Sequence, residues 1–280
     1  MRPLDDGLYL DQDCPINWQW PGNSGLVSEW AGVPLSGWWG GKTVYDLAHG
    51  AKPRNDGTFN GGVSWQPSGR PGGHGCLRFN GSASYVSFPT IRFPAGFTLA
   101  CWINTSDTGT TGADYVPKVP LFNDPSSYLD FGIGSTGSGR LSCYSGPASV
   151  QGSGSIADGT WHHVAATHSL SGTLTLYADG KINGSGSVTY DTVHLTVVRM
   201  GGNFGPSGSF LNGLMDVADV YNRAISSAEV AALCDQGQRG QPDRWSWRKP
   251  VTYFTPQKAG GNSIFWGGVF ASRIIGRPAA

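Results

Sequence analysis

Residues 161–180, with the sequence WHHVAATHSLSGTLTLYADG, decide the fold class. Apolar and small side chains fall on both sides of the alternating pattern that a strand would give each half of this stretch. Ser171-Gly172 is a turn signal between the two halves, and Asp179-Gly180 predicts a type I′ turn after them. We therefore expect a β-hairpin that is buried on both faces or that packs against a second sheet.

The paired histidines of this stretch, His162 and His163, invite a metal or acid–base interpretation. Adjacent residues of a strand point to opposite faces, so the two imidazoles cannot bind one ion together. We expect one histidine to lie in the core and the other to be held by a hydrogen bond.

The composition of the whole chain agrees with an all-β domain. Its 43 glycines and 18 prolines imply many turns, and no long amphipathic helical period is present. One helix is predicted after Ser226, because Ser226 and Glu229 have the spacing of a capping box and Ile225 can pack on Val230. This helix is expected to end near Cys234, and the glycine-rich residues 152–159 are expected to form a loop.

Three stretches of the sequence resemble the laminin G-like domains of the concanavalin A-like lectin/glucanase superfamily. They are residues 161–180, with Tyr-x-Asp-Gly at the end; residues 210–233, FLNGLMDVADVYNRAISSAEVAAL; and Val44-Tyr45-Asp46-Leu47 followed by Gly61-Gly62-Val63. The resemblance implies a concanavalin A-like jelly-roll β-sandwich of two antiparallel sheets with one short C-terminal helix. It implies little about the ligand, because this fold hosts lectins, enzymes and assembly modules.

The resemblance divides the chain into an N-terminal arm at residues 1–25, a sandwich at 26–235 and an extended tail at 236–280. Seven basic residues and one acidic residue lie in the tail, although the chain as a whole is neutral. Aromatic residues alternate with these charges, so the tail could bind nucleic acid, lie on an anionic membrane or dock onto another protein subunit. Its glycine-broken, strand-like character favours docking. The predicted docking residues are Trp245, Trp247, Arg248, Tyr253, Phe254, Phe265 and Trp266.

Two kinds of ligand site are also predicted. The resemblance implies a structural calcium ion, with Asp46 and Asp216 as its ligands, because calcium prefers carboxylate oxygens and because the first and last strands can lie side by side. Exposed aromatic rings and amide or carboxylate groups on loops would suit a carbohydrate. The residues that fit this second description are Trp38, Trp39, Asn123, Asp124 and Asn203.

An enzyme is not expected. The glucanases of the superfamily use closely spaced carboxylates, whereas this chain has only two glutamates, Glu29 and Glu229, which are far apart. Glu229 is accounted for by the capping box, and Glu29 stands alone on the first expected strand. The motifs GxSxG and HExxH are also missing from the sequence.

The first residues contain no apolar secretory segment, and no run of apolar residues is long enough to span a membrane. The five cysteines show no close pairing and predict buried, reduced thiols. These features favour a non-enzymatic assembly protein: a homo-oligomeric bacteriophage virion component, such as a capsid decoration or head-fibre protein, whose lectin-like domain could also bind glycans. The alternative hypothesis is a carbohydrate-binding module at a bacterial surface or outside the cell.

Overall fold

The structure is a computed structural model of the chain. It describes residues 9–10, 16–33, 41–48, 54–73, 75–93, 96–109, 117–124, 129–134, 137–145, 148–188, 195–202 and 209–248.

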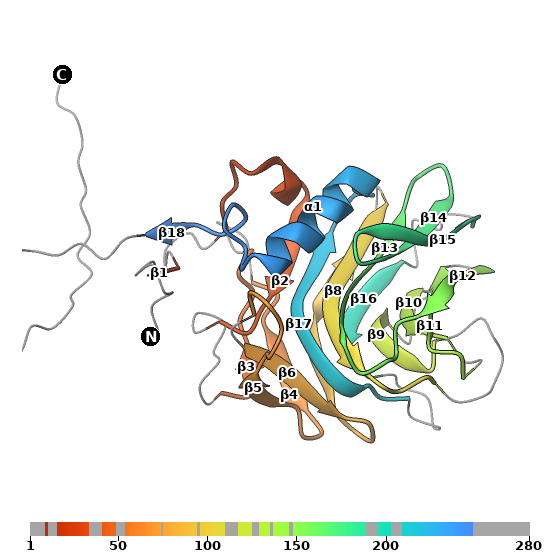
Figure 1. The fold of residues 1–280 in the computed structure, drawn as a ribbon, viewed down its shortest axis with the longest axis horizontal. Coiled ribbons are helices and arrows are strands. Elements are labelled where there is room, and N and C mark those ends of the chain that lie inside the picture. Colours follow the sequence, from red (N-terminus) through yellow and green to blue (C-terminus); the bar gives the residue numbers. More distant parts are fainter. Residues whose placement is uncertain are drawn as a thin grey trace, which may run out of the picture.

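Two antiparallel sheets are stacked in a sandwich, as the sequence predicts (Figure 1). The first sheet has the strand order β12 (Ala148–Ser155), β11 (Arg140–Ser145), β10 (Leu129–Ile133), β9 (Val119–Asp124), β16 (Thr196–Met200), β7 (Tyr85–Arg92), β4 (Gly57–Asn60) and β3 (Thr43–Val44). The second sheet has the order β15 (Lys181–Ser187), β14 (Thr173–Ala178), β13 (Trp161–His168), β8 (Phe97–Thr105), β17 (Asn212–Tyr221), β6 (Gly75–Asn80) and β5 (Ser64–Pro67), and β2 (Leu26–Trp30) also pairs with β17.

The main hydrophobic core fills the space between the sheets. Phe122 and Phe131 of the first sheet stack with their ring centroids 6.5 Å apart, and Leu99 and Val164 belong to the same core from the second sheet. All four side chains are fully buried. Burial of a large apolar side chain stabilises a fold by about 1.5–3 kcal/mol, so this core is the main source of stability for the sandwich.

The hairpin predicted at residues 161–180 is confirmed. β13 pairs with β14, and Asp179 and Gly180 have φ angles of 50° and 76°, both in the left-handed region that a type I′ turn requires. Val164 and Leu176 point into the main core, whereas Ala165 and Tyr177 belong to a second apolar cluster. The hairpin is therefore buried on both faces because each face packs against a different layer.

The second apolar cluster lies on the outer face of the second sheet, where α1 (Ser227–Gln238) packs (Figure 1). The predicted capping box is present: Ser226 Oγ accepts the Glu229 N–H, and Glu229 Oε2 accepts the Ser226 N–H at 2.7 Å. Val230 and Leu233 are buried against the sheet. The helix ends at Gln238, one turn beyond the predicted end near Cys234. None of the helices in the described ranges is long and apolar enough to cross a membrane.

Segments from both ends of the described chain complete this layer. A short 3-10 helix η1 (Pro21–Asn23) precedes β2, Ile16 forms a β-bridge with Trp245, and β1 (Tyr9–Leu10) pairs with β18 (Trp247–Arg248). Ile16 and Trp245 are buried in the second apolar cluster. The structure therefore extends the sandwich beyond the predicted limits of 26 and 235, to include residues 16–25 and 236–245.

One predicted loop is a strand. Residues 148–155 form β12, which pairs with β11 from Ser145↔Ala148 to Arg140↔Ser155 with one register shift. Three of its eight residues are serines and two are glycines, which are poor strand formers, so the neighbouring strand rather than local propensity imposes the extended conformation. The prediction of a loop at 152–159 is therefore wrong for its first four residues.

Candidate functional site

Asp46, the first of the two residues predicted to bind calcium, is buried just after β3. Its Oδ1 accepts hydrogen bonds from the backbone N–H groups of Glu29 (3.0 Å) and Ala48 (2.9 Å), and its Oδ2 accepts one from that of Asn55 (3.2 Å). Burial raises the pKa of Asp46, and these N–H groups lower it in part. The carboxylate thus joins three backbone segments, which is a structural role.

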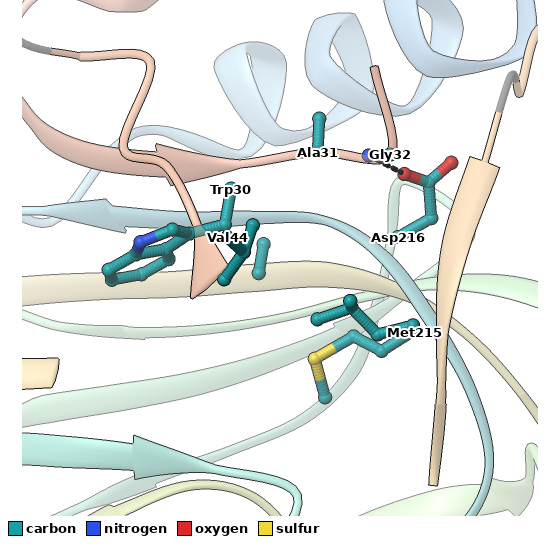
Figure 2. Close-up of a pocket in the computed structure, with 8 residues that line it drawn as sticks. Trp30, Ala31, Gly32, Val44, Met215 and Asp216 are labelled. Atoms are coloured by element: carbon teal, nitrogen blue, oxygen red, sulfur yellow. Dashed lines mark hydrogen bonds between the residues drawn. The ribbon is translucent and has the colours of Figure 1, made fainter. Parts of the chain in front are cut away.

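Asp216, the second predicted calcium ligand, forms a buried ion pair. It lies at an irregularity of β17, where Val217 has a φ of 44°, a strained value for a β-branched residue. Its Oδ2 lies 2.8 Å from Arg70 Nη2, and its Oδ1 accepts the Gly32 N–H at 3.1 Å (Figure 2). A guanidinium therefore stands where a cation would bind, and the described surroundings of Asp46 and Asp216 do not fit a calcium ion.

The recess beside Asp216 is also too small to be a ligand site. Its empty volume is about 180 Å³, including space open to solvent, whereas small-molecule sites are usually about 300–1,000 Å³. Its other lining residues are mainly apolar: Trp30, Ala31, Gly32, Val44, Leu77, Met215 and Ala218 (Figure 2). In the described ranges, no group of three His, Cys, Asp or Glu side chains is placed to hold a metal ion.

Of the residues predicted to bind carbohydrate, Asn123 and Asp124 are described, whereas Trp38, Trp39 and Asn203 lie outside the described residues. Asn123 and Asp124 are neighbours in β9 and point to opposite faces. Asp124 accepts a hydrogen bond from the Thr196 hydroxyl. Asn123 is paired with Asp130 and, on the other side, with Arg199, so these three residues share the outer face of the first sheet.

Asn123 is the middle of a row of polar residues that crosses the whole first sheet. Residues that are paired across neighbouring strands point to the same face of a sheet. When the pairings are followed from strand to strand across the seven pairs, they connect one outward-pointing residue of each strand in a single line. From β12 to β3 this polar row consists of Ser149, Tyr144, Asp130, Asn123, Arg199, Ser87, Thr58 and Thr43.

The centre of the polar row contains buried polar atoms without a hydrogen-bond partner among the described residues. These atoms are Asn123 Oδ1 and Nδ2, Asp130 Oδ1 and, in the neighbouring row, Ser142 Oγ. Burial raises the pKa of Asp130 from its ordinary value of 3.8 to about 7; the Asn123 amide lowers it in part, and Asp124 raises it. Because an unpaired buried polar group costs about 1–3 kcal/mol, such a cluster is unusual unless water or a ligand completes it.

Aromatic rings flank this cluster on both sides. The Arg199 guanidinium carbon lies 4.0 Å from the centroid of the Tyr85 ring, a cation–π contact that holds both side chains on the outer face. Tyr144 is the partner of Asp130 in β11, and both tyrosines are half-buried. The site therefore combines amide, carboxyl, hydroxyl and guanidinium groups with two aromatic rings.

Sequence reasoning found only Asn123 of this site and missed Asp130, Arg199 and Ser142. The alternation Leu129-Asp130-Phe131 was a usable local signal, because it places a single acid opposite two core residues. Arg199 carries no such alternation, because Val198 and Met200 flank it and the register of β16 shifts between Val197 and Arg199. The order of strands, which the sequence does not show, brings these residues together.

The residues predicted to dock onto a partner are mostly outside the described residues: this applies to Tyr253, Phe254, Phe265 and Trp266, and to the side chains of Trp247 and Arg248. For Trp245 the prediction is wrong. Trp245 is 3% exposed, and its indole N–H donates a hydrogen bond to Glu29 Oε1 within the same chain. Its aromatic surface therefore fills the second apolar cluster rather than a partner's pocket.

Next to Trp245, Arg244 occupies the centre of a fully bonded network that we call the Arg244 cluster. Arg244 Nη2 lies 2.6 Å from Glu29 Oε2 and 2.9 Å from Asp219 Oδ1. Its Nε donates to Asn23 Oδ1 at 3.1 Å, and Asn23 Nδ2 in turn donates to the Arg244 carbonyl at 3.0 Å. Tyr221 and Trp245 complete the cluster.

The two glutamates are thus both in structural positions, Glu29 in the Arg244 cluster and Glu229 in the capping box. Glu29 is fully buried, which raises its pKa to about 8, although Arg244 lowers it in part. The Glu229 pKa is held at about 2, chiefly by its hydrogen bond from Arg223. Neither glutamate is placed beside the polar row.

The histidine pair behaves as predicted. His163 is buried against Trp102, with 5.4 Å between ring centroids, and burial lowers its pKa to about 3. His162 points the other way, with its Nδ1 2.8 Å from Asp179 Oδ2 and its Nε2 3.2 Å from Asp158 Oδ1. The hydrogen bond with Asp179 is the main cause that raises the His162 pKa.

These features define a class: a two-sheet jelly-roll domain of the lectin-like type, with a polar face on one sheet and a helix on the other. Residues 80–231 match the model of a laminin G-like family that is described as the concanavalin A-like lectin/glucanases superfamily. The chain belongs to this family, as its sequence resemblance implied. A comparison with curated protein sequences finds no match.

Solved structures of the same fold include the binding domains of toxins. The binding domain of botulinum neurotoxin DC in complex with SialylT has a TM-score of 0.56 at 12% identity, over 78% of this chain and 52% of that one. The binding domain of Paraclostridial Mosquitocidal Protein 1 has a TM-score of 0.57 at 17% identity, over 77% and 53%. The present chain therefore matches about half the length of each, and at these identities the likeness concerns the fold alone.

Proposed function

We propose that this domain is a carbohydrate-binding module and that the polar row of the first sheet is its binding face. The observation that carries the proposal is the group of buried, unpartnered polar atoms of Asn123, Asp130 and Ser142. On the second sheet, by contrast, α1 and the chain ends cover the outer face. The first sheet is therefore the side on which we place the ligand.

The chemistry of these groups suits a sugar. An amide offers donors and acceptors together, a carboxyl group accepts or donates according to its protonation, and a hydroxyl does both. Sugar hydroxyl groups need such mixed partners, and water can fill the same positions when no sugar is bound. The half-buried rings of Tyr85 and Tyr144 can pack against the apolar face of a sugar ring.

Solved structures of the same fold also support a carbohydrate ligand, but less strongly than the polar row does. One of them is a toxin binding domain in complex with SialylT, and another is described by the dependence of cell entry on two ganglioside molecules. A third is a complex with the protein rat synaptotagmin II. The fold is thus compatible with glycan and protein ligands, and the polar row is what favours a glycan here.

The proposal can be tested with an array of immobilised glycans, followed by calorimetry on the glycan that binds best. We expect Asn123→Ala and Asp130→Asn to lower the affinity at least about tenfold, because each removes a hydrogen-bonding group from the centre of the row. Asn222→Ala, an exposed asparagine after β17, is the matched control and should bind like the unchanged protein. Binding to no glycan, or equal binding by all variants, would show that the proposal is wrong.

A second candidate function is structural, and it is compatible with the first. Residues 249–280 contain four basic residues, no acidic residue and five aromatic residues, a composition that suits attachment to another subunit. We infer that this segment fixes the domain to a larger assembly, such as a phage virion, as a homo-oligomer; a bacterial surface or extracellular protein is the alternative.

Light scattering on the full chain and on a variant that ends at residue 248 tests this second function. The truncation keeps every described residue, including the Arg244 cluster. A defined oligomer that becomes a monomer on truncation supports the structural role. Two monomers would contradict it and leave the carbohydrate-binding proposal in place.

A further inference from the structure

β15 is an edge strand of the second sheet, and in the described ranges it pairs only with β14. Proteins usually protect such an edge with charged residues, proline or a bulge. The sequence of β15, KINGSGS, has no proline and a single charge at its first residue, Lys181, and its register with β14 shifts at Asn183. The last four residues, 184–187, therefore lack all three kinds of protection.

The backbone of these residues offers hydrogen bonds to the open side of the strand. Val188 N–H donates to the Gly172 carbonyl at 2.7 Å, and hydrogen-bonded pairs alternate along an antiparallel ladder, so Gly186 directs its backbone groups to β14. The N–H and C=O groups of Ser185 and Ser187 then point away from β14. Both serines are exposed, so one more strand can pair with them.

The neighbouring edge strand of the first sheet covers the inner face of β15 but not its edge. A Cβ atom on Gly184 or Gly186 would collide with Gln151 or Val150 of β12. These two glycines are the partners of core residues of β14, so β12 packs on the side of β15 that faces the core. The glycines of β15 are thereby explained, whereas its open edge is not.

Two exposed apolar side chains flank the open edge. Ile182, near the start of β15, is 62% exposed, and Leu170 is 60% exposed. Leu170 lies in the turn before β14, and the bond between Gly172 and Val188 places this turn beside the end of β15. The edge thus offers apolar contacts at both ends and backbone hydrogen bonds between them.

A segment of this chain outside the described residues has the matching pattern. Residues 264–270, IFWGGVF, carry large apolar side chains on both sides of a central pair of glycines, with no charge and no proline. Aromatic and β-branched residues favour an extended strand. The segment has seven residues, as β15 does, so its two apolar ends can reach both ends of the open edge.

The position of the chain end indicates which copy receives this segment. The described chain ends at β18, on the opposite side of the sandwich from β15 (Figure 1). Residues 249–263 can span up to about 50 Å, enough to carry the segment away from its own domain. We propose that residues 264–270 of one copy add a strand to the open edge of β15 in the next copy, in a head-to-tail assembly. This inference rests on the proposed structural role of residues 249–280 and specifies the surface that receives them.

Two full-chain variants separate the receiving edge from the donated segment. Ser185→Pro removes an N–H that points to the open edge, where an edge strand tolerates proline, and Ser185→Ala is its control because it keeps that N–H. Phe265→Pro/Trp266→Pro disrupts the donated segment in either register, because successive N–H groups of a strand point to opposite sides. Lys258→Pro/Ala259→Pro, outside the segment, is its control.

Light scattering should show an oligomer for the unchanged protein and for both controls. Association should be at least about tenfold weaker for Ser185→Pro and for Phe265→Pro/Trp266→Pro. An equal mixture of these two variants should form a dimer and nothing larger, because the first still donates its segment and the second still offers its edge. Equal urea midpoints for Ser185→Pro and Ser185→Ala would show that the sandwich is intact.

An oligomer that Ser185→Pro leaves unchanged, or a mixture that stays monomeric, would overturn this inference. An unchanged oligomer of Phe265→Pro/Trp266→Pro would also overturn it, and this variant leaves every described residue in place. In each case the structural role still stands if truncation at residue 248 dissociates the oligomer. A monomeric full chain would overturn both the inference and the role on which it rests.

Discussion

The outer faces of the two sheets both hold buried polar side chains, and Asn23 and Asn123 illustrate how differently they do so. Both asparagines are 0% exposed. Asn23, on the side of the second sheet, exchanges hydrogen bonds with Arg244 and donates to the Asn17 carbonyl. Asn123, on the first sheet, has no partner for either side-chain polar atom among the described residues. The satisfied group supports the fold, whereas the unsatisfied one keeps hydrogen-bonding capacity that no described residue fills.

The largest effect that this comparison predicts comes from the Arg244 cluster. Arg244→Ala should lower the free energy of unfolding by about 3–5 kcal/mol, because Glu29 and Asp219 lose the buried cation that they share. Urea unfolding followed by tryptophan fluorescence measures this loss. Arg239→Ala, which breaks an exposed pair with Asp235, is the control and should change stability by less than about 0.5 kcal/mol. Similar losses in both variants would contradict a structural role for the cluster.

The two asparagines give a more direct test of the comparison. Asn23→Ala should cost about 1–3 kcal/mol of unfolding free energy, because it removes the acceptor of the buried Arg244 Nε–H and one hydrogen-bond donor to the Arg244 carbonyl. Asn123→Ala removes only an interaction with the Asp130 carboxyl group, so we expect a change of less than about 1 kcal/mol or a small gain. Urea unfolding of both variants in one buffer measures the two changes in unfolding free energy. A larger loss for Asn123→Ala would mean that this residue, too, is part of the scaffold.

The smallest effect concerns the pH dependence of stability. Burial holds the pKa of Asp130 at about 7 in the folded chain, above its ordinary value of 3.8, so the folded state binds this proton more tightly than the unfolded state. The stability that this group contributes is present below about pH 4 and is lost as the pH rises through about 7. Asp130→Asn should remove this loss.

Unfolding curves at a series of pH values test this prediction. The variant should gain about 1–2 kcal/mol over the unchanged protein between pH 4 and pH 8. Asn222→Ala, which removes no titratable group from an exposed position after β17, is the control and should leave the pH profile unchanged. A profile that is parallel for Asp130→Asn and the unchanged protein would show that Asp130 is not buried in solution.

Sequence reasoning predicted the features that depend on neighbouring residues. The hairpin at residues 161–180, its Asp179-Gly180 turn and the capping box of α1 follow from local pattern, and all are confirmed. β12 was missed because its serines and glycines carry no local strand signal and only the register with β11 makes it a strand. The two-sheet arrangement followed from the resemblance rather than from local pattern.

The candidate site could be predicted only in part, for a related reason. Asn123 was identified by its residue type, but the polar row exists only because residues between 43 and 199 are brought into line by strand order. Arg244 was assigned to a tail because its partner Glu29 lies 215 residues away. Pairing over such a distance leaves no periodic signal in the sequence.

The bonds between the two ends of the described chain have a mechanical consequence. Asn17 N–H donates to the Arg244 carbonyl at 2.9 Å, and Ile16 bridges Trp245, so the two ends leave the sandwich side by side. A force that pulls the ends apart therefore loads this short ladder first and then the Arg244 ion pairs, which join Arg244 to β2 and β17 of the second sheet. Neither ion-pair partner of Arg244 lies in the first sheet, so we expect such a force to reach the polar row only through the second sheet.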